Sequence, residues 1–134
     1  MKAPPRFTET EWEIMRVIWA HPNVTATEII AQLSLSDPTW HPKTTRALIA
    51  RLVQKGVLGY EAHDRAYVYR SLYTEQECVA AASESFLQRV FGGSLQPMLA
   101  FFVEQRRLTK KDLAELSELL EGRTPKPPRK NRRL

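Results

Sequence analysis

The segment from Pro42 to Gly56 constrains the fold of this chain most strongly, because both of its ends carry helix signals. Proline suits the first turn of a helix, where its missing N–H costs nothing, and glycine suits the left-handed residue that ends one. Between them, apolar residues recur at spacings of three and four, which predicts a helix with one buried face. That face comprises Thr45, Leu48, Ile49, Leu52 and Val53.

The opposite face of this helix is basic, small and hydroxyl-bearing. It comprises Lys43, Thr44, Arg46, Ala47, Ala50, Arg51 and Gln54. A helix that enters the major groove of DNA needs short side chains among its arginine, lysine and threonine contacts, so that its backbone can approach the bases. We therefore interpret the segment as a recognition helix. For this helix alone, a solvated charged face would be the simpler interpretation, but the neighbouring segments favour DNA.

Two shorter helices are predicted before it, over residues 8–19 and 26–33, with a stop at residues 21–23. Each begins with a capping box, in which a threonine and a glutamate three residues later bond each other's backbone N–H groups. The pairs are Thr8 with Glu11 and Thr25 with Glu28. Three short helices, the last of them basic, are the order of a helix-turn-helix.

After Gly56 the apolar period changes from 3.6 to 2, which indicates strands. Residues 57–62 and 66–72 are predicted to pair as a β-hairpin, with tyrosine and valine as strand formers. A hairpin directly after a recognition helix is the wing of a winged helix. Arg65 at its tip is expected to contact the sugar-phosphate backbone, and an exposed turn arginine without a partner is an equally good interpretation.

Three further helices are predicted between residues 74 and 122, and their apolar stripes exceed what a winged helix can cover. The expected solution is a two-fold homodimer whose paired recognition helices bind a palindromic site. The alternative is a helical subdomain that packs on the wing of its own chain. The expected dimer interface comprises Phe86, Val90, Leu99, Phe101, Phe102, Leu113, Leu116 and Leu120.

The net charge of +5 is unevenly distributed. Residues 41–70 carry +4, which coincides with the candidate recognition helix and supports a nucleic-acid face. Residues 123–134 carry +6 with three prolines and no apolar pattern, so a disordered basic tail is expected there. This tail either attracts phosphates without sequence preference or simply aids solubility.

Several classes of protein are disfavoured. The three histidines, His21, His41 and His63, fall in a helix stop, a helix start and a turn, and no nucleophile motif or phosphate loop appears, so we expect no enzyme, cofactor or metal site. Cys78 is the only cysteine and is expected to be a small buried residue. Without a signal peptide or a long apolar run, a cytoplasmic protein with no membrane insertion is expected.

The motifs at residues 10–19 (TEWEIMRVIW), 42–56 (PKTTRALIARLVQKG) and 67–69 (YVY) resemble the BlaI/MecI/CopY penicillinase-repressor family. The similarity extends from Phe7 to Gly122. It implies a winged-helix N-terminal domain, a helical dimerisation domain and repression of transcription at an operator with dyad symmetry. In this family the start of the recognition helix contacts bases and phosphates. The corresponding residues are Lys43, Thr44 and Arg46, with Arg51 as a further contact.

The resemblance also implies a mode of induction. In the β-lactam-responsive repressors, a membrane-bound zinc metalloprotease sensor leads to cleavage of an Asn-Phe bond in the second dimerisation helix, just before Val-Glu. The matching stretch here is Phe101-Phe102-Val103-Glu104, without the asparagine. Cleavage at Phe101–Phe102 and a purely structural role in the dimer core both remain open. The copper-responsive branch carries paired cysteines near the C-terminus, which this chain lacks.

The sequence thus predicts a mainly α protein with a small β-hairpin. Its expected parts are a flexible lead-in (1–6), a winged helix-turn-helix domain (7–73), a helical dimerisation domain (74–122) and a basic disordered tail (123–134). The predicted function is sequence-specific repression of transcription as a homodimer on double-stranded DNA, in an antibiotic response. The alternative is a winged helix that binds another protein and no specific DNA sequence.

Overall fold

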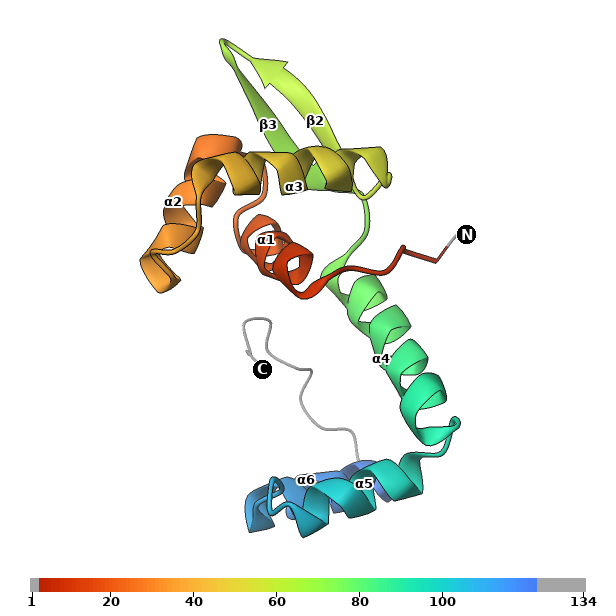
Figure 1. The fold of residues 1–134 in the computed structure, drawn as a ribbon. Coiled ribbons are helices and arrows are strands. Elements are labelled where there is room, and N and C mark those ends of the chain that lie inside the picture. The colour runs from red at the N-terminus through yellow and green to blue at the C-terminus, as the bar shows by residue number, and fades with distance from the viewer. Residues whose placement is uncertain (1–2, 123–134) are drawn as a thin grey trace. The chain divides into compact units, whose positions relative to one another are not determined.

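The computed structural model describes residues 3–122, so the predicted basic tail lies outside the described residues. The elements are α1 (Glu9–Ala20), β1 (Val24–Thr25), α2 (Ala26–Ser36), α3 (Pro42–Gln54), β2 (Leu58–His63), β3 (Ala66–Ser71), α4 (Glu75–Phe91), α5 (Leu95–Glu104) and α6 (Lys110–Leu120) (Figure 1). Within the described residues, these elements fall into two compact units, 3–82 and 83–122. The start of the dimerisation domain at residue 74 remains a prediction.

The helices begin where the sequence predicted, because the same type of cap opens four of them. In each capping box the threonine hydroxyl accepts from a backbone N–H and the acidic side chain accepts from the N–H of the threonine. The pairs are Thr8 with Glu11, Thr25 with Glu28, Thr74 with Glu77, and Thr109 with Asp112. α2 is three residues longer than predicted, and it ends before Pro38, which disfavours a helical conformation for Asp37.

The helix α3, predicted as a recognition helix, ends at the glycine that the sequence indicated. Gly56 has φ of +82°, and its N–H donates to the carbonyl of Val53 at 3.0 Å. The N–H of Val57 donates to the carbonyl of Leu52 at 3.1 Å, which completes a Schellman motif. The chain therefore leaves α3 in a fixed direction and passes directly into the hairpin.

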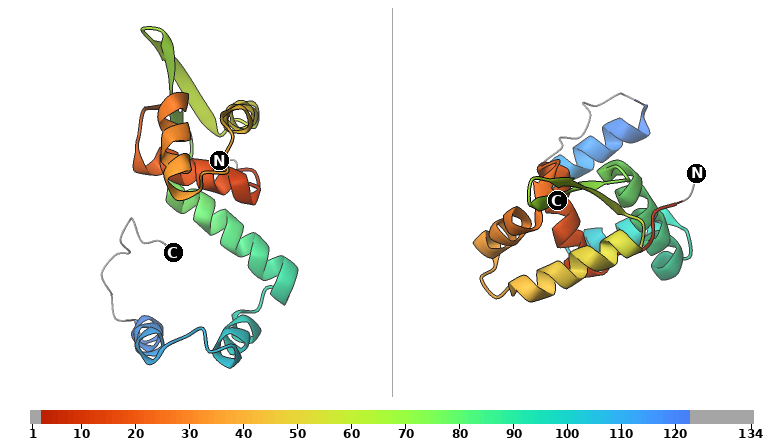
Figure 2. Two further views of the ribbon diagram at one scale, coloured as in Figure 1. Left: turned by 60° about the vertical axis from the view of Figure 1, so that its left-hand side comes forward. Right: turned by 90° about the horizontal axis from the view of Figure 1, so that it is seen from above.

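The predicted hairpin of β2 and β3 is confirmed, with Asp64 in the left-handed region (φ 55°) at its turn. The strand β1 was not predicted; it pairs with β3 through Val24 opposite Tyr69 and gives the sheet order β1-β3-β2. A two-residue strand is too short to show a period of two. In the left view of Figure 2 the hairpin extends beyond α1, α2 and α3.

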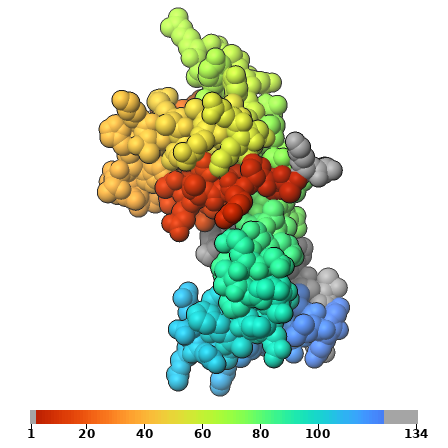
Figure 3. All heavy atoms as spheres, turned by 45° about the vertical axis from the view of Figure 1, so that its right-hand side comes forward, coloured from red at the N-terminus to blue at the C-terminus, as the bar shows by residue number. Residues whose placement is uncertain are grey.

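The hydrophobic core of residues 3–82 lies among α1, α2, α3 and the base of the sheet. The predicted buried face of α3 is confirmed: Thr45, Leu48, Ile49 and Leu52 are buried, and Val53 is half-buried. The other fully buried apolar side chains are Ile14, Met15, Ile18, Ile29 and Val57. The opposite side of α3 forms part of the molecular surface, with α1 below it and the hairpin above it (Figure 3).

The second unit differs from the first in the burial of its apolar side chains. Among its described residues, 83–122, no side chain is buried, although the segment is rich in leucine and phenylalanine. α5 and α6 therefore leave much of their apolar surface uncovered within this one chain. Large apolar residues exposed in the segment are Phe86, Val90, Leu95, Phe101, Val103, Leu113, Leu119 and Leu120.

Replacing Leu52 with alanine should destabilise the winged helix strongly, because its side chain is fully buried beneath α3. We expect Leu52→Ala to lower the free energy of unfolding by about 2–5 kcal/mol in urea titrations. The exposed Gln54 lies on the same helix and provides a control, for which Gln54→Ala should change it by less than about 0.5 kcal/mol. Equal effects of the two variants would contradict this assignment of the core.

Candidate nucleic-acid interface

The predicted DNA-facing side of α3 is exposed along its whole length. The exposed residues are Lys43, Thr44, Arg46, Ala47, Ala50, Arg51 and Gln54. At the start of the helix, the His41 ring accepts at Nδ1 from the N–H of Lys43 at 3.1 Å, which confirms that His41 opens the helix. The positive side chains thus project from a helix whose first turn is fixed by a cap.

A groove brings together two arginines that are far apart in the sequence. Arg46 of α3 and Arg65 of the hairpin turn line it together with Ala26 and Thr27, in the first turn of α2. Its other lining residues are Thr25, Ala66, Tyr67 and Tyr69. Two guanidinium groups and the N-terminus of a helix make this groove positive, so it suits a phosphate oxygen. Sequence reasoning proposed both arginines but could not place them on one groove.

Three tyrosine rings pack together on the hairpin that carries Arg65. Tyr60 and Tyr69 are opposite one another on β2 and β3, with ring centroids 6.1 Å apart, and Tyr67 lies 4.9 Å from Tyr60. Burial raises the pKa of Tyr69, as does Tyr67, and the nearby Arg46 acts in the opposite direction. This aromatic cluster was missed at the sequence level, although the alternation of Tyr67 and Tyr69 places both on one face of a strand.

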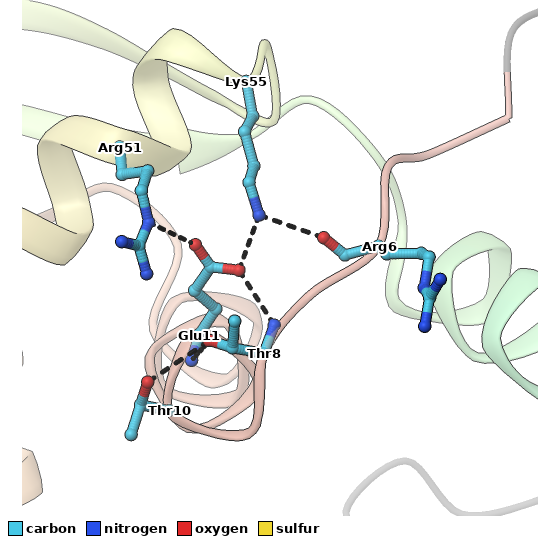
Figure 4. A network of polar contacts seen from close by, with 6 residues as sticks. All are labelled: Arg6, Thr8, Thr10, Glu11, Arg51 and Lys55. Carbon is cyan, nitrogen blue, oxygen red and sulfur yellow. Dashed lines mark hydrogen bonds and ion pairs between the residues drawn. The ribbon is translucent and has the colours of Figure 1, made fainter.

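A buried carboxylate connects α1 to α3 (Figure 4). Glu11 is fully buried, and its Oε2 accepts from Nε of Arg51 at 3.0 Å. Its Oε1 accepts from Nζ of Lys55 at 2.7 Å and from the N–H of Thr8 at 2.9 Å. Lys55 also donates to the carbonyl of Arg6 at 3.0 Å. From the sequence, Glu11 was predicted only as part of a helix cap, because its charge partners lie 40 and 44 positions away along the chain.

The pKa of Glu11 is set by two opposing effects. Burial raises it, while the hydrogen bonds from Lys55, from the N–H of Thr8 and from Arg51 lower it, and the net result is a pKa below the ordinary value of 4.5. Glu11 is therefore ionised at neutral pH, and its charge contributes to folding only while it remains so.

Cys78 is buried, as predicted, and burial raises the pKa of its thiol to about 11. Because a thiolate is the reactive form, this residue is expected to be unreactive at neutral pH. In the part of the chain that the structure describes, no group of three or more His, Cys, Asp or Glu side chains is arranged to hold a metal ion. No helix within residues 3–122 is long and apolar enough to cross a bilayer.

The residues predicted for the dimer interface lie on α4, α5 and α6. Phe86, Val90, Phe101, Leu113 and Leu120 are exposed, while the remaining three are half-buried, namely Leu99, Phe102 and Leu116. Phe101 and Phe102 lie inside α5 with their rings edge to face, 5.4 Å between centroids. The Phe101–Phe102 peptide bond, which corresponds to the cleavage position implied by the family resemblance, therefore lies within a regular helix.

The three N-terminal helices, the hairpin and the exposed basic face of α3 define a winged-helix DNA-binding protein. A family model for the penicillinase repressor matches residues 7–122. The penicillinase repressor of Bacillus licheniformis is 36% identical over 90% of this chain and 94% of its own length. The methicillin resistance regulatory protein MecI of Staphylococcus aureus is 31% identical over 84% and 91%, respectively. The chain belongs to the penicillinase-repressor family, and it is a DNA-binding transcriptional repressor and not an enzyme.

Solved structures support the same assignment for the N-terminal unit. The solution structure of the DNA-binding domain of the repressor BlaI matches with a TM-score of 0.51 and 36% identity, over 57% of this chain and 93% of that domain. The monomeric form of Bacillus licheniformis BlaI in complex with the blaP half-operator matches with a TM-score of 0.50. These comparisons confirm the predicted fold class and family.

Acid should remove the contribution of Glu11 to stability. Because its pKa in the folded protein lies below 4.5, this contribution is present in full above that pH and is lost as the pH falls through the folded value. Near neutral pH, we expect Glu11→Gln to lower the free energy of unfolding by about 1–3 kcal/mol, less than for a fully buried pair because both cations reach solvent.

The measurement is urea unfolding of wild type and Glu11→Gln between about pH 3 and pH 7, since the difference should shrink in acid. The exposed Glu9, in the same turn of α1, gives the control Glu9→Gln. A difference between wild type and Glu11→Gln that stays constant over this range would show that ionisation of Glu11 does not stabilise the fold.

Proposed function

We propose that this repressor binds as a homodimer to an operator with dyad symmetry and controls β-lactam resistance genes in the cytoplasm. The observation that carries the proposal is the exposed basic face of α3, on a fold shared with BlaI bound to its half-operator. Lys43, Thr44 and Arg46 contact bases and phosphates at the start of the helix. Ala47 lets the backbone approach the major groove.

The wing supplies contacts that position the protein without selecting a sequence. Arg65 at the hairpin turn and Arg46 share one groove with the first turn of α2, which suits a phosphate of the DNA backbone. Arg46 therefore lies where it can contact a phosphate or the edge of a neighbouring base. Its replacement distinguishes the two roles, because loss of a base contact reduces discrimination and loss of a phosphate contact does not.

The dimer is supported by the uncovered apolar surface of the second unit. Val90 is 53% exposed, Phe101 46% and Leu113 45%, although each occupies an apolar stripe of its helix. Clustered exposed residues of this kind mark protein interfaces. A second copy of the chain covers them by two-fold symmetry and brings two recognition helices to a palindromic operator.

For α5 we propose a structural role in the dimer core, with relief of repression by cleavage as the alternative. Its backbone groups are bonded within the helix, so a protease would reach the Phe101–Phe102 bond only after α5 unwinds. Phe101 remains 46% exposed within one chain, which favours a contribution of its ring to the dimer core. The alternative is cleavage of this bond by a protease of a membrane-sensor pathway. Incubation of the repressor with such a protease, followed by mass spectrometry, distinguishes cleavage from a purely structural role.

Specific DNA binding should depend on the start of α3. In gel-shift titrations against the promoter upstream of its own gene, with a scrambled competitor, we expect Lys43→Ala with Arg46→Ala to abolish the specific band. Arg46→Ala alone should weaken specific binding by about 1–3 kcal/mol if Arg46 contacts a base. Arg89 lies on α4, is exposed, and gives the control Arg89→Ala with the same loss of charge.

Two results would separate this proposal from a winged helix that binds protein only. Wild-type binding should weaken steeply with salt, because each neutralised phosphate releases counterions. If the promoter gives no specific band, the next experiment is selection of bound sequences from a pool of randomised duplexes. Failure to enrich any sequence from that pool would favour the protein-interaction hypothesis.

The dimer should be sensitive to charge on α4. Val90→Glu places a carboxylate in the proposed interface, and we expect the dimer dissociation constant to rise at least about tenfold in sedimentation equilibrium. Leu35 on α2 is 80% exposed and outside the proposed interface, so Leu35→Glu provides a matched control. A wild-type protein that sediments as a monomer at all concentrations would contradict the proposal.

A further inference from the structure

We propose that Glu11, which lies inside the protein, is a positioning residue for DNA binding: it holds Arg51 by Nε so that the outer end of the guanidinium group binds a DNA phosphate. This inference rests on the proposed binding of DNA by α3, and it assigns different roles to the two cations that Glu11 holds.

The carboxylate of Glu11 has little freedom to move. It is fully buried on α1, and each of its oxygens is bonded: Oε2 to Arg51, and Oε1 to both Lys55 and the N–H of Thr8 (Figure 4). The Thr8 bond belongs to the capping box of α1, so the carboxylate is fixed to the backbone of one helix while it binds side chains of another. Any group bonded to Oε2 is held in a defined place.

Arg51 receives its orientation from this carboxylate. A guanidinium group is planar and carries five N–H donors, so fixing Nε fixes the direction of the two terminal nitrogens. Within residues 3–122, Nε of Arg51 bonds Glu11, whereas its terminal nitrogens make no hydrogen bond to the protein. The Arg51 side chain is 51% exposed, and its carboxylate partner is fully buried. The remaining donors are therefore available at the surface of α3.

The position of Arg51 along α3 places these donors on the DNA-facing side. Arg51 follows Ala47 by one helical turn and Thr44 by two, and all three residues are exposed. An arginine on this ridge reaches the phosphate strand that borders the groove occupied by the start of the helix. Phosphate accepts the forked donors of arginine in the same way as a carboxylate.

Lys55 is less exposed than Arg51 and is bonded to two groups of the protein. Its ammonium group donates to both Glu11 and the carbonyl of Arg6, and the side chain is only 28% exposed. Lys55 therefore joins α3 to α1 and to the N-terminal segment. Arg51 provides the same tie to α1 and, in addition, donors for DNA.

The test is a double-mutant cycle on DNA affinity. The probe is a duplex selected from a randomised pool by the wild-type chain, titrated with full-length protein at several salt concentrations. We expect Arg51→Ala to reduce the salt slope by about 0.9 per protomer, which is about an eightfold loss of affinity per protomer at about 0.1 M salt. The loss should be equal on an unrelated duplex, as for a phosphate contact.

Glu11→Gln should weaken binding by about threefold or more in the wild-type background and have no effect in the Arg51→Ala background, because contacting residues are energetically coupled. Glu9→Gln, an exposed change in the same turn, is the control and should leave affinity unchanged. Urea unfolding of each variant confirms that it is folded at the assay temperature. Arg51→Lys keeps a cation for Glu11 but loses the fork, so it should retain stability and still show the shallower salt slope.

Equal losses for Glu11→Gln with and without Arg51 would overturn the inference and leave Glu11 a purely structural residue. An unchanged salt slope in both Arg51→Ala and Arg51→Lys would also overturn it, while the proposed function stands. If the wild-type chain enriches no duplex from the pool, the proposed function fails and this inference fails with it.

Discussion

The buried carboxylate of Glu11 pairs with Arg51 of α3 and with Lys55, which caps that helix, and these two ion pairs constrain how α3 lies on α1. The apolar face of α3 must pack on the core while its basic face stays in solvent. Leucine and isoleucine contacts alone would allow α3 to rotate about its axis or slide along the core. Arg51 and Lys55 reach Glu11 at 3.0 and 2.7 Å, respectively, which fixes α3 relative to α1. An ionic contact requires specific geometry, whereas hydrophobic contact does not.

The two units of the chain use apolar surface in opposite ways. In the first, α1, α2 and α3 bury a complete core around Ile14, Ile49 and Leu52. In the second, the described helices leave residues such as Val90 and Leu113 exposed, so that the apolar surface is available to a partner. This contrast fits the proposed dimer, in which the second unit of one copy packs on that of the other.

Much of the fold could be predicted from local signals. The capping boxes at Thr8 and Thr25 mark where helices start, and Gly56 marks where α3 ends, because each of these features depends on residues close together in sequence. The exceptions have physical causes. β1 is too short to show a period, and α2 continues through Ser34, Leu35 and Ser36, whose side chains do not prevent helical hydrogen bonding.

The sequence by itself determined which residues of α3 are buried, which are basic and exposed, and which family the chain resembles. Only the tertiary structure decided that Arg46 and Arg65 line one groove, that Tyr60 joins Tyr67 and Tyr69, and that Arg51 bonds Glu11. Periodicity reports the side of an element on which a residue lies, but not the residues of other elements that it meets. Contacts between residues of different elements form only when helices and strands pack. Such contacts distinguish an arginine that is bonded to the protein, such as Arg51, from one that is not.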